Sequence, residues 1–461
     1  MATLPYTIAI LGGGPAGLSA AQHAKAMGGR IAVVAPPPLG GTCLNWGCYP
    51  VHYLREAARL WRESPNGQLD WPAVLAAKEA RLALLREQDA RVLSGYFAMK
   101  WFPESGRFVG PHQVAVGDEV LTVANVLVAT GARPAFTPEQ EAVGAISPGA
   151  ALALPSLPRS MLVLGSEGRC LEAAQILARF GVQVAVVETG ERLAPEQERD
   201  VSQALTALLE SDGVEVWTGV RLVALRREGA ECVAILEEED KERETTFRSE
   251  LRAEVVVAGG RRGNTEALGL EAVGLSANAD GYLPVDSQLR TAVDWVWGGG
   301  DVVGGPFLSS VAAQDGVVVV ENVYRKADRQ RDLSLVPSVI NTDPRVARVG
   351  LGEAEAWEVG FKAKSIALPL SSFPAAIAEG NAQGMVKLVA EGGTELLLGA
   401  HIVAPHADEL INAAALALRG RLTLLDLQEM LFASPTLSAA FRPTARAFFR
   451  PGGDVVPCCG D

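Results

Sequence analysis

Residues 7–17 read TIAILGGGPAG, an apolar run of strand length followed at once by a cluster of glycines. A helical Ala-rich stretch comes next, and the apolar residues 31–34 have the length of a second strand. In that order, Gly12 permits a tight turn, Gly14 lets the backbone approach a pyrophosphate, and Gly17 lets helix and strand pack closely. Free N–H groups at the helix start add positive potential for phosphates. The chain is therefore predicted to begin with a dinucleotide-binding unit.

A second stretch of the same kind begins at Met161, with a strand at 161–164, a helix at 171–180 and a strand at 182–187 that leads to Glu188. From residue 337 onward, short strands and helices are mixed, as in an α+β domain. The chain is therefore predicted to be α/β, with two Rossmann-like dinucleotide-binding domains and a C-terminal α+β domain. Further predictions are helices in 54–93, 309–324, 407–418 and 425–432, buried strands at 123–128 and 253–258, a solvated hairpin or loop at 237–244, and a linker at 325–333.

Composition narrows the class of protein. The 461 residues include 41 Lys and Arg against 54 Asp and Glu, a formal net charge of −13, which argues against nucleic acid or an anionic membrane as the main partner. No apolar run approaches the roughly 18 residues of a membrane span, and no targeting signal is visible, so a cytoplasmic protein is expected.

Six cysteines are too few for a disulfide scaffold. Four of them are close in sequence, Cys43 with Cys48 and Cys458 with Cys459, whereas Cys170 and Cys232 are assigned to core packing.

The segment that carries chemistry is 39–50, LGGTCLNWGCYP. Two cysteines so spaced at a helix start can form a disulfide, and a thiolate there gains from the helix dipole. Glycines before Cys43 and before Cys48 leave the backbone open to a planar group. The alternative is a permanent disulfide or two buried thiols.

This segment is similar to the redox-active segment of the FAD-dependent pyridine nucleotide-disulfide oxidoreductases, which include dihydrolipoamide dehydrogenase, glutathione reductase and mercuric reductase. The resemblance extends over the chain through ATGARP (129–134), GGRRGNTEAL (259–268), Gly300-Asp301-Val302, TDPRVARVGLGEAEA (342–356) and GAHIVAPHADELI (399–411). It implies a homodimer with one FAD per chain, in which electrons pass from NAD(P)H through the flavin to the Cys43–Cys48 disulfide. By family position, Cys48 would contact the flavin as the charge-transfer thiol, and Cys43 would be the interchange thiol.

The resemblance also implies the domain order and the cofactor contacts. The expected parts are an FAD-binding domain (1–148), an NAD(P)-binding domain (149–270), a second FAD-contacting segment (271–334), a dimerisation domain (335–450) and a Cys-Cys tail (451–461). The expected cofactor-binding residues are Gly12, Gly14, Pro15, Ala16, Gly17, Gly41, Thr42, Thr130, Gly131, Gly165, Glu188, Gly260, Gly300 and Asp301.

Three positions depart from the family near the reacting groups. The His of the His-Pro-Thr motif, the base for thiol–disulfide exchange, is Ser434, and the Glu that orients it is Ala439. Serine does not titrate near neutral pH, so efficient reduction of a dithiol-type disulfide is not expected. His52 stands in place of the Lys near the flavin, with Glu172 at the place of its carboxylate partner. His52 is interpreted either as a catalytic cation or as a tolerated polar substitution.

Both nucleotide sites also depart from the pattern. Ala35 replaces the acid at the end of the second strand, a loss of one ribose hydrogen bond that is worth on the order of 1–3 kcal/mol. Glu167 occupies the second glycine position of the later turn, where mercuric reductases also lack glycine. Glu188 is retained and would repel a 2′-phosphate, which favours NADH.

Three functions stay open at this stage. Mercuric reductases end in a Cys-Cys pair like Cys458-Cys459 and dispense with the base, so the leading hypothesis is reduction of a soft metal, Hg(II), held by Cys43, Cys48, Cys458 and Cys459. The Tyr that mercuric reductases carry near the lost base is absent from 432–441. The alternatives are a reductase of another disulfide that uses the tail pair as a relay, and an FAD-binding protein that no longer uses a nicotinamide. His401 and His406 are assigned a structural role.

Overall fold

A computed structural model describes residues 5–63, 69–240 and 245–450. The described chain forms two compact units, one made of residues 5–53, 70–137 and 259–333, the other of the remaining described residues. Helix α3 (Cys48–Glu63) begins in the first unit and ends in the second. No helix among the described residues is both long and apolar enough to cross a bilayer.

The first unit is built on a parallel sheet with the strand order β17-β7-β1-β2-β3. Four of its short strands are fully buried, as expected where helices cover both faces of a parallel sheet, and the edge strand β3 is partly exposed. The elements are β1 (Ile8–Leu11), β2 (Ile31–Val34), β3 (Met99–Phe102), β7 (Val126–Val128) and β17 (Val296–Gly298), with α1 (Pro15–Met27), α2 (Gly41–Trp46), α4 (Trp71–Val92) and α9 (Ser309–Arg325). Two small antiparallel sheets join β4 (Gly106–Gly110), β5 (Gln113–Val116) and β6 (Glu119–Thr122), and β8 (Ala132–Pro134) with β16 (Arg261–Gly263). Short 3₁₀ turns are η1 (Leu270–Val273) and η2 (Gly300–Val303).

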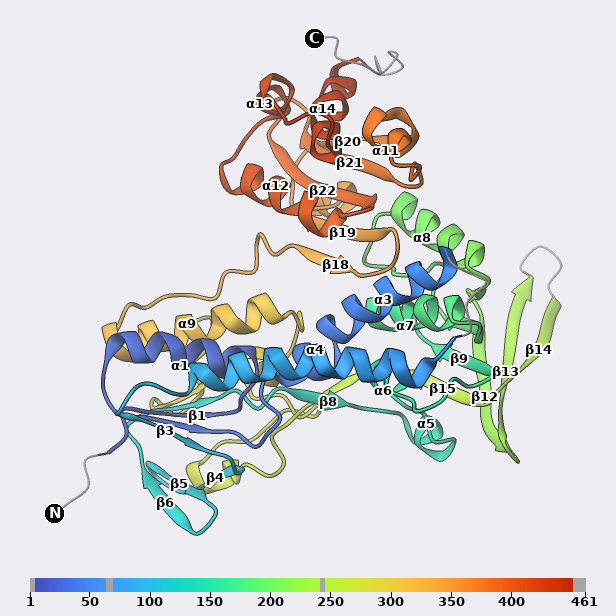
Figure 1. Ribbon diagram of the computed structural model, residues 1–461. Coiled ribbons are helices and arrows are strands. Elements are labelled where there is room, and N and C mark those ends of the chain that lie inside the picture. Colours follow the sequence, from blue (N-terminus) through green and yellow to red (C-terminus); the bar gives the residue numbers. More distant parts are fainter. Residues whose placement is uncertain (1–4, 64–68, 241–244, 451–461) are drawn as a thin grey trace. The chain divides into compact units, whose positions relative to one another are not determined.

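Helices α1 and α9 lie side by side in the first unit (Figure 1). Gly316 of α9 permits this contact, because a Cβ there would lie 2.3 Å from the carbonyl oxygen of Ala16. Since α1 follows the first glycine turn, this close packing positions the turn.

The second unit contains a parallel sheet with the order β11-β10-β9-β15. Its elements are β9 (Ser160–Leu164), β10 (Gln183–Glu188), β11 (Glu215–Thr218) and β15 (Val255–Ala258), with α5 (Pro138–Ala142), α6 (Pro148–Ala151), α7 (Gly168–Arg179) and α8 (Arg199–Ser211). An antiparallel sheet of β12 (Arg221–Glu228), β13 (Glu231–Asp240) and β14 (Thr245–Ala253) adjoins it (Figure 1).

The same unit holds the α+β domain, whose antiparallel sheet has the order β18-β19-β22-β21-β20. The strands are β18 (Ser338–Ile340), β19 (Arg345–Gly350), β20 (Ala363–Pro369), β21 (Met385–Glu391) and β22 (Leu397–Ala404). The helices are α10 (Glu353–Glu358), α11 (Pro374–Ala378), α12 (Ala407–Arg419), α13 (Leu424–Glu429) and α14 (Phe441–Phe449), with the 3₁₀ turns η3 (Leu370–Ser372) and η4 (Leu437–Ala440). The predicted α/β architecture with two dinucleotide-binding sheets and a C-terminal α+β domain is confirmed.

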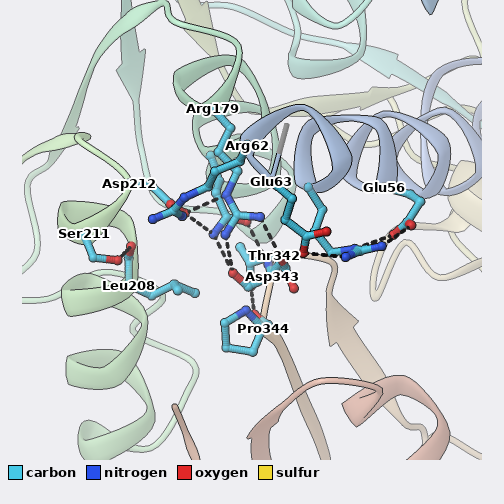
Figure 2. Close-up of polar contacts among 12 residues, drawn as sticks. Glu56, Arg62, Glu63, Arg179, Leu208, Ser211, Asp212, Thr342, Asp343 and Pro344 are labelled. Atoms are coloured by element: carbon cyan, nitrogen blue, oxygen red, sulfur yellow. Dashed lines mark hydrogen bonds and ion pairs between the residues drawn. The ribbon is translucent and has the colours of Figure 1, made fainter. Parts of the chain in front are cut away.

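A buried ionic network joins the parts of the second unit (Figure 2). The carboxylate of Asp212, at the end of α8, accepts hydrogen bonds from Gln175 (2.8 Å) and Arg179 Nε (2.9 Å) of α7, and from Arg62 of α3. Arg179 also donates to the side chain (2.5 Å) and the carbonyl (2.8 Å) of Asp343, which precedes β19. The network therefore ties the end of α3, the helices of the second parallel sheet and the C-terminal domain together.

Several local expectations need correction. The hairpin at 237–244 is confirmed in its described strands, but Glu237 is buried rather than solvated, because Arg221 and Arg248 pair with it. The strand expected from 123 starts at Val126, and Val123 only bridges to Tyr6. Helix α13 ends at Glu429 instead of 432, because Met430 is extended. The buried placement of Cys170 and Cys232 is confirmed.

Candidate active site

The first glycine turn is shaped for a phosphate. A Cβ on Gly12 would lie 2.1 Å from the Ala129 carbonyl oxygen, and one on Gly17 would lie 1.9 Å from that of Gly12, so both must be glycine. A Cβ on Gly14 would find only the Gly41 Cα, at 3.7 Å, which leaves room in front of the helix. Helix α1 starts with Pro15 and has no side-chain cap, so its first N–H groups point into that room. This arrangement fits the pyrophosphate of a dinucleotide such as FAD.

The cysteine segment is attached directly to this turn. The amide of Gly40 donates to the carbonyl of Gly13 at 2.8 Å, and a Cβ on Gly41 would lie 2.9 Å from the Gly14 Cα. Gly41 has φ +58°, a conformation that favours glycine. Residues 41 and 42 therefore start α2 beside the phosphate position, where Gly41 and Thr42 are predicted to contact the cofactor.

Cys43 lies within α2, and Cys48 is the first residue of the 16-residue helix α3. Cys43 is half-buried and Cys48 is exposed. The structure thus disagrees with the alternative of two buried thiols. The N-terminus of α3 favours a negative charge on Cys48. Tyr49 follows at once; burial, and next the charges of Cys43 and Cys48, raise the pKa of its phenol.

The other predicted FAD contacts lie in the same unit. Thr130 Oγ1 donates to the carbonyl of Asn264 at 2.7 Å, and Gly131 has φ +72° with open space where a Cβ would be. The carboxylate of Asp301 forms an ion pair with Arg261 at 2.8 Å. The amide of Gly300 donates to Asp315 at 2.9 Å.

Asp315 is a site residue that sequence reasoning missed. It is fully buried, it accepts two hydrogen bonds from Arg331, both at 2.9 Å, and burial raises the pKa of its carboxyl group. Together with the Gly300 amide, this pair fixes the turn that carries Asp301. A polar residue inside an apolar helix pattern is the signal that could have identified it.

The second glycine turn is open but carries acidic residues. Gly165 has φ +91° and open space at its Cβ position, and Glu167 is the N-cap of α7 without a side-chain capping bond. At the end of β10, Glu188 accepts hydrogen bonds from Ser166 Oγ (2.5 Å) and the Gly190 amide (2.8 Å). The carboxylate of Glu188 is therefore held at the strand end, where a ribose is predicted to bind. Ser166 was not anticipated from the sequence.

Gly260 belongs to the first unit, and the second glycine turn belongs to the second. A Cβ there would lie 2.6 Å from the carbonyl oxygen of Ala135, so close backbone packing accounts for this glycine. Its contact with a cofactor stays a prediction.

Glu172 of α7 is buried, and burial raises the pKa of its carboxyl group. It accepts hydrogen bonds from the backbone amide (2.7 Å) and side-chain amide (2.8 Å) of Asn341. His52 belongs to the first unit and Glu172 to the second, so their pairing stays a prediction.

Ser434 is exposed, between α13 and η4. Cys458 and Cys459 lie outside the described residues, so their role as metal ligands or as a relay stays a prediction. Among the residues that are described, no group of three or more His, Cys, Asp and Glu side chains is arranged to hold a metal ion.

Comparison with known families decides the class of this chain. The family model described as "Pyridine nucleotide-disulphide oxidoreductase" matches residues 6–316, and that family's dimerisation domain matches residues 336–445. The chain belongs to the pyridine nucleotide-disulphide oxidoreductase family. The family is FAD-dependent and takes electrons from pyridine nucleotides, so the protein is a flavin-dependent oxidoreductase. The dimerisation domain supports a homodimer.

Curated relatives of this family cover almost the whole chain. It is 34% identical to a mercuric reductase of Acidithiobacillus ferrooxidans, over 98% of the chain and 84% of the relative. It is 32% identical to a mercuric reductase of Streptomyces lividans, over 99% of the chain and 98% of the relative. It is also 31% identical to a dihydrolipoyl dehydrogenase of Bacillus subtilis, over 96% of the chain and 98% of the relative.

Solved structures agree in fold. The HOCl-induced flavoprotein disulfide reductase RclA of Escherichia coli is 23% identical, with a TM-score of 0.86 over 96% of this chain and 99% of that one. At this identity, the similarity concerns the fold alone.

Proposed function

We propose that this flavoprotein oxidoreductase reduces Hg(II) with electrons from NADH. One observation carries the choice of substrate: an exposed serine, Ser434, occupies the place of the family's base. An organic disulfide needs a proton for its leaving thiolate, which serine does not hold near neutral pH. A metal ion held by two thiolates needs no such proton.

In this proposal, Cys43 and Cys48 hold the metal as a two-coordinate dithiolate, the ligand set that soft cations prefer. FAD, when bound, relays the two electrons of NADH to the site. Both sulfur–metal bonds then break, the metal leaves as Hg(0), and two thiolates remain on the chain. Support comes from the exposure of Cys48, from its place at the N-terminus of α3, and from relatives named mercuric reductase. The tail pair Cys458 and Cys459 would deliver the ion.

The test is anaerobic NADH oxidation by the FAD-loaded enzyme, with Hg(II) in excess thiol. We expect metal-dependent turnover that Cys43→Ser abolishes, while NADH still bleaches the flavin. Cys458→Ser is expected to lower turnover at limiting metal. Normal bleaching of the flavin without metal-dependent turnover would exclude the proposal. Failure of NADH and NADPH to bleach the flavin would instead favour an FAD-binding protein without a nicotinamide, the interpretation suggested by Glu167.

NADH is proposed as the donor because of Glu188. Its carboxylate, held by Ser166 and Gly190, would meet the 2′-phosphate of NADPH. Arg192, which follows Glu188 by four residues, donates to the carbonyls of Gln197 (2.5 Å) and Pro195 (2.6 Å), so its guanidinium is bonded to the backbone. Glu188→Ala should narrow the ratio of kcat/KM for NADH over NADPH by about tenfold. A ratio unchanged by this substitution would contradict the assignment.

A second candidate, reduction of another disulfide with the tail as relay, is favoured by the likeness to a dihydrolipoyl dehydrogenase. It predicts NADH-dependent reduction of a small disulfide that Cys458→Ser abolishes. Unchanged disulfide turnover in Cys458→Ser would rule out the relay.

A further inference from the structure

The turn that carries Cys43 is held from a helix far along the chain. Asn45 is buried in α2, and its side-chain amide donates to the carbonyls of Leu39 and Gly41, both at 2.9 Å. Arg86 of α4 donates from Nε to Asn45 Oδ1 at 2.7 Å. The Asn45 side chain thus connects the beginning of α2 to α4.

The three hydrogen bonds fix the orientation of the Asn45 amide. Turning it over would place its oxygen against two carbonyl oxygens and its NH₂ group against the guanidinium of Arg86. Glu79 forms an ion pair with the same guanidinium and holds it in place.

Helix α2 is too short to be stable by itself. It has six residues, far fewer than an isolated helix needs. Its N-cap, Gly40, has φ +91° and makes no side-chain capping bond. Beside the backbone bond of Gly40 to Gly13, Asn45 adds three side-chain hydrogen bonds to this turn, two to its carbonyls and one from α4. The position of Cys43 relative to Cys48 therefore depends on them.

We propose that Arg86 is a positioning residue that, through Asn45, holds Cys43 in register with Cys48 and so sets the stability of their disulfide. The inference rests on the proposed function in one respect, that these two cysteines are the redox pair. When the disulfide forms, both thiols give up a proton, and two electrons pass to the oxidant. Its equilibrium constant rises with the effective concentration of one thiol at the other, which a loose turn lowers.

The measurement is the equilibrium of the FAD-loaded enzyme with oxidised and reduced dithiothreitol, without metal or other substrate. In this exchange, two protein thiols become a disulfide while one dithiothreitol disulfide becomes a dithiol. Alkylation and mass spectrometry of the peptide containing Cys43 and Cys48 give the constant. Loss of the charge-assisted bond in Arg86→Met should lower it about tenfold. Arg86→Lys, which retains a donor, should recover most of that loss.

The matched control is Arg91→Met, on the same helix, which removes an exposed ion pair with Glu87 and should leave the constant unchanged. Asn45→Ala should lower the constant at least as far as Arg86→Met, and the double variant no further than Asn45→Ala. An unchanged constant in Arg86→Met, or additive effects in the double variant, would overturn the inference. If the Arg86→Met enzyme does not retain its flavin, Glu79→Gln is measured instead. The equilibrium constant should then fall by about threefold, and an unchanged constant would count against the inference.

These results separate the two proposals. A wild-type disulfide that Arg86→Met weakens, without any reduction of Hg(II), would refute the metal substrate and leave the positioning role intact. Reduction of Hg(II) together with an unaltered constant would refute the positioning role alone.

Discussion

The substitution Asp212→Ala should destabilise the second unit more than any exposed ion pair does. Asp212 has a side chain with 0% exposure and joins α3, α7 and α8 (Figure 2). Its removal breaks one charge-assisted bond to Arg179 and one bond to Gln175, worth about 1.5–3 and about 1 kcal/mol. The bond to Arg62, which is 54% exposed, adds less than about 1 kcal/mol. Arg179 keeps its bonds to Asp343, so it does not become an unpaired buried charge.

We therefore expect Asp212→Ala to lower the opening free energy of the second unit by about 3–5 kcal/mol. The chain has several domains, so a single unfolding midpoint would not isolate this loss. The buried thiol of Cys170, in α7, reports it directly, because labelling of this thiol requires the region to open. In the native holoenzyme, labelling of Cys170 read by mass spectrometry should accelerate by about 150- to 5,000-fold.

Glu63→Gln is the control, since it removes an ion pair with Arg59 in which both side chains are exposed. It should change the labelling rate by less than about threefold. If Asp212→Ala accelerates labelling of Cys170 by less than about threefold, burial does not give this network its strength. The same conclusion follows if Glu63→Gln accelerates labelling as much as Asp212→Ala does.

Three further outcomes are expected. Burial lowers the pKa of His401 to about 4, so as pH falls below 6.5 the unfolded state binds a proton that the folded state does not. The region around β22 should therefore lose about 3 kcal/mol of stability by pH 4, read by hydrogen exchange of the β22 amides, and His401→Gln should show a flatter pH profile. The pKa of Glu172 is raised, so the stability of the region around α7 falls as pH rises from the unfolded value of 4.5 into the raised one; Glu172→Gln, which keeps an acceptor for Asn341, should lack that fall, and its Cys170 should be labelled more slowly than that of wild type at neutral pH. Gly316→Ala puts a Cβ 2.3 Å from the Ala16 carbonyl and should weaken FAD retention at a cost of about 1–3 kcal/mol; equal FAD release on dialysis would contradict this.

The local sequence pattern was sufficient to predict the elements that depend on hydrophobic periodicity and on the spacing of glycines. The strand at 8–11, the glycine turn and α1 lie where the sequence places them, because one apolar run and one turn chemistry define all three. Glu237 shows the limit of that reasoning. A run of acidic residues indicates a solvated segment, but Arg221 and Arg248, from two neighbouring strands, enclose this one side chain.

In the candidate site, too, some features follow from the local sequence and others depend on contacts between distant residues. Cys43 and Cys48 could be identified from their spacing and flanking glycines. Asn45 lay within the same motif, but its partner Arg86 is 41 residues away on a helix with no distinguishing pattern. Such a contact depends on tertiary packing, and one sequence without its structure carries no signal for it.

The first parallel sheet has a consequence for the growing chain. Its edge strand β17 (296–298) pairs with β7 (126–128), and α9, which packs on α1, comes later still. All strands of the second parallel sheet lie between residues 160 and 258. During synthesis, the second sheet is therefore complete before the N-terminal one can close, although domains usually fold from the N-terminus onward. Until residues 296–325 emerge, the edge of β7 and the face of α1 stay uncovered, and unpaired edges and apolar faces of this kind are prone to aggregation.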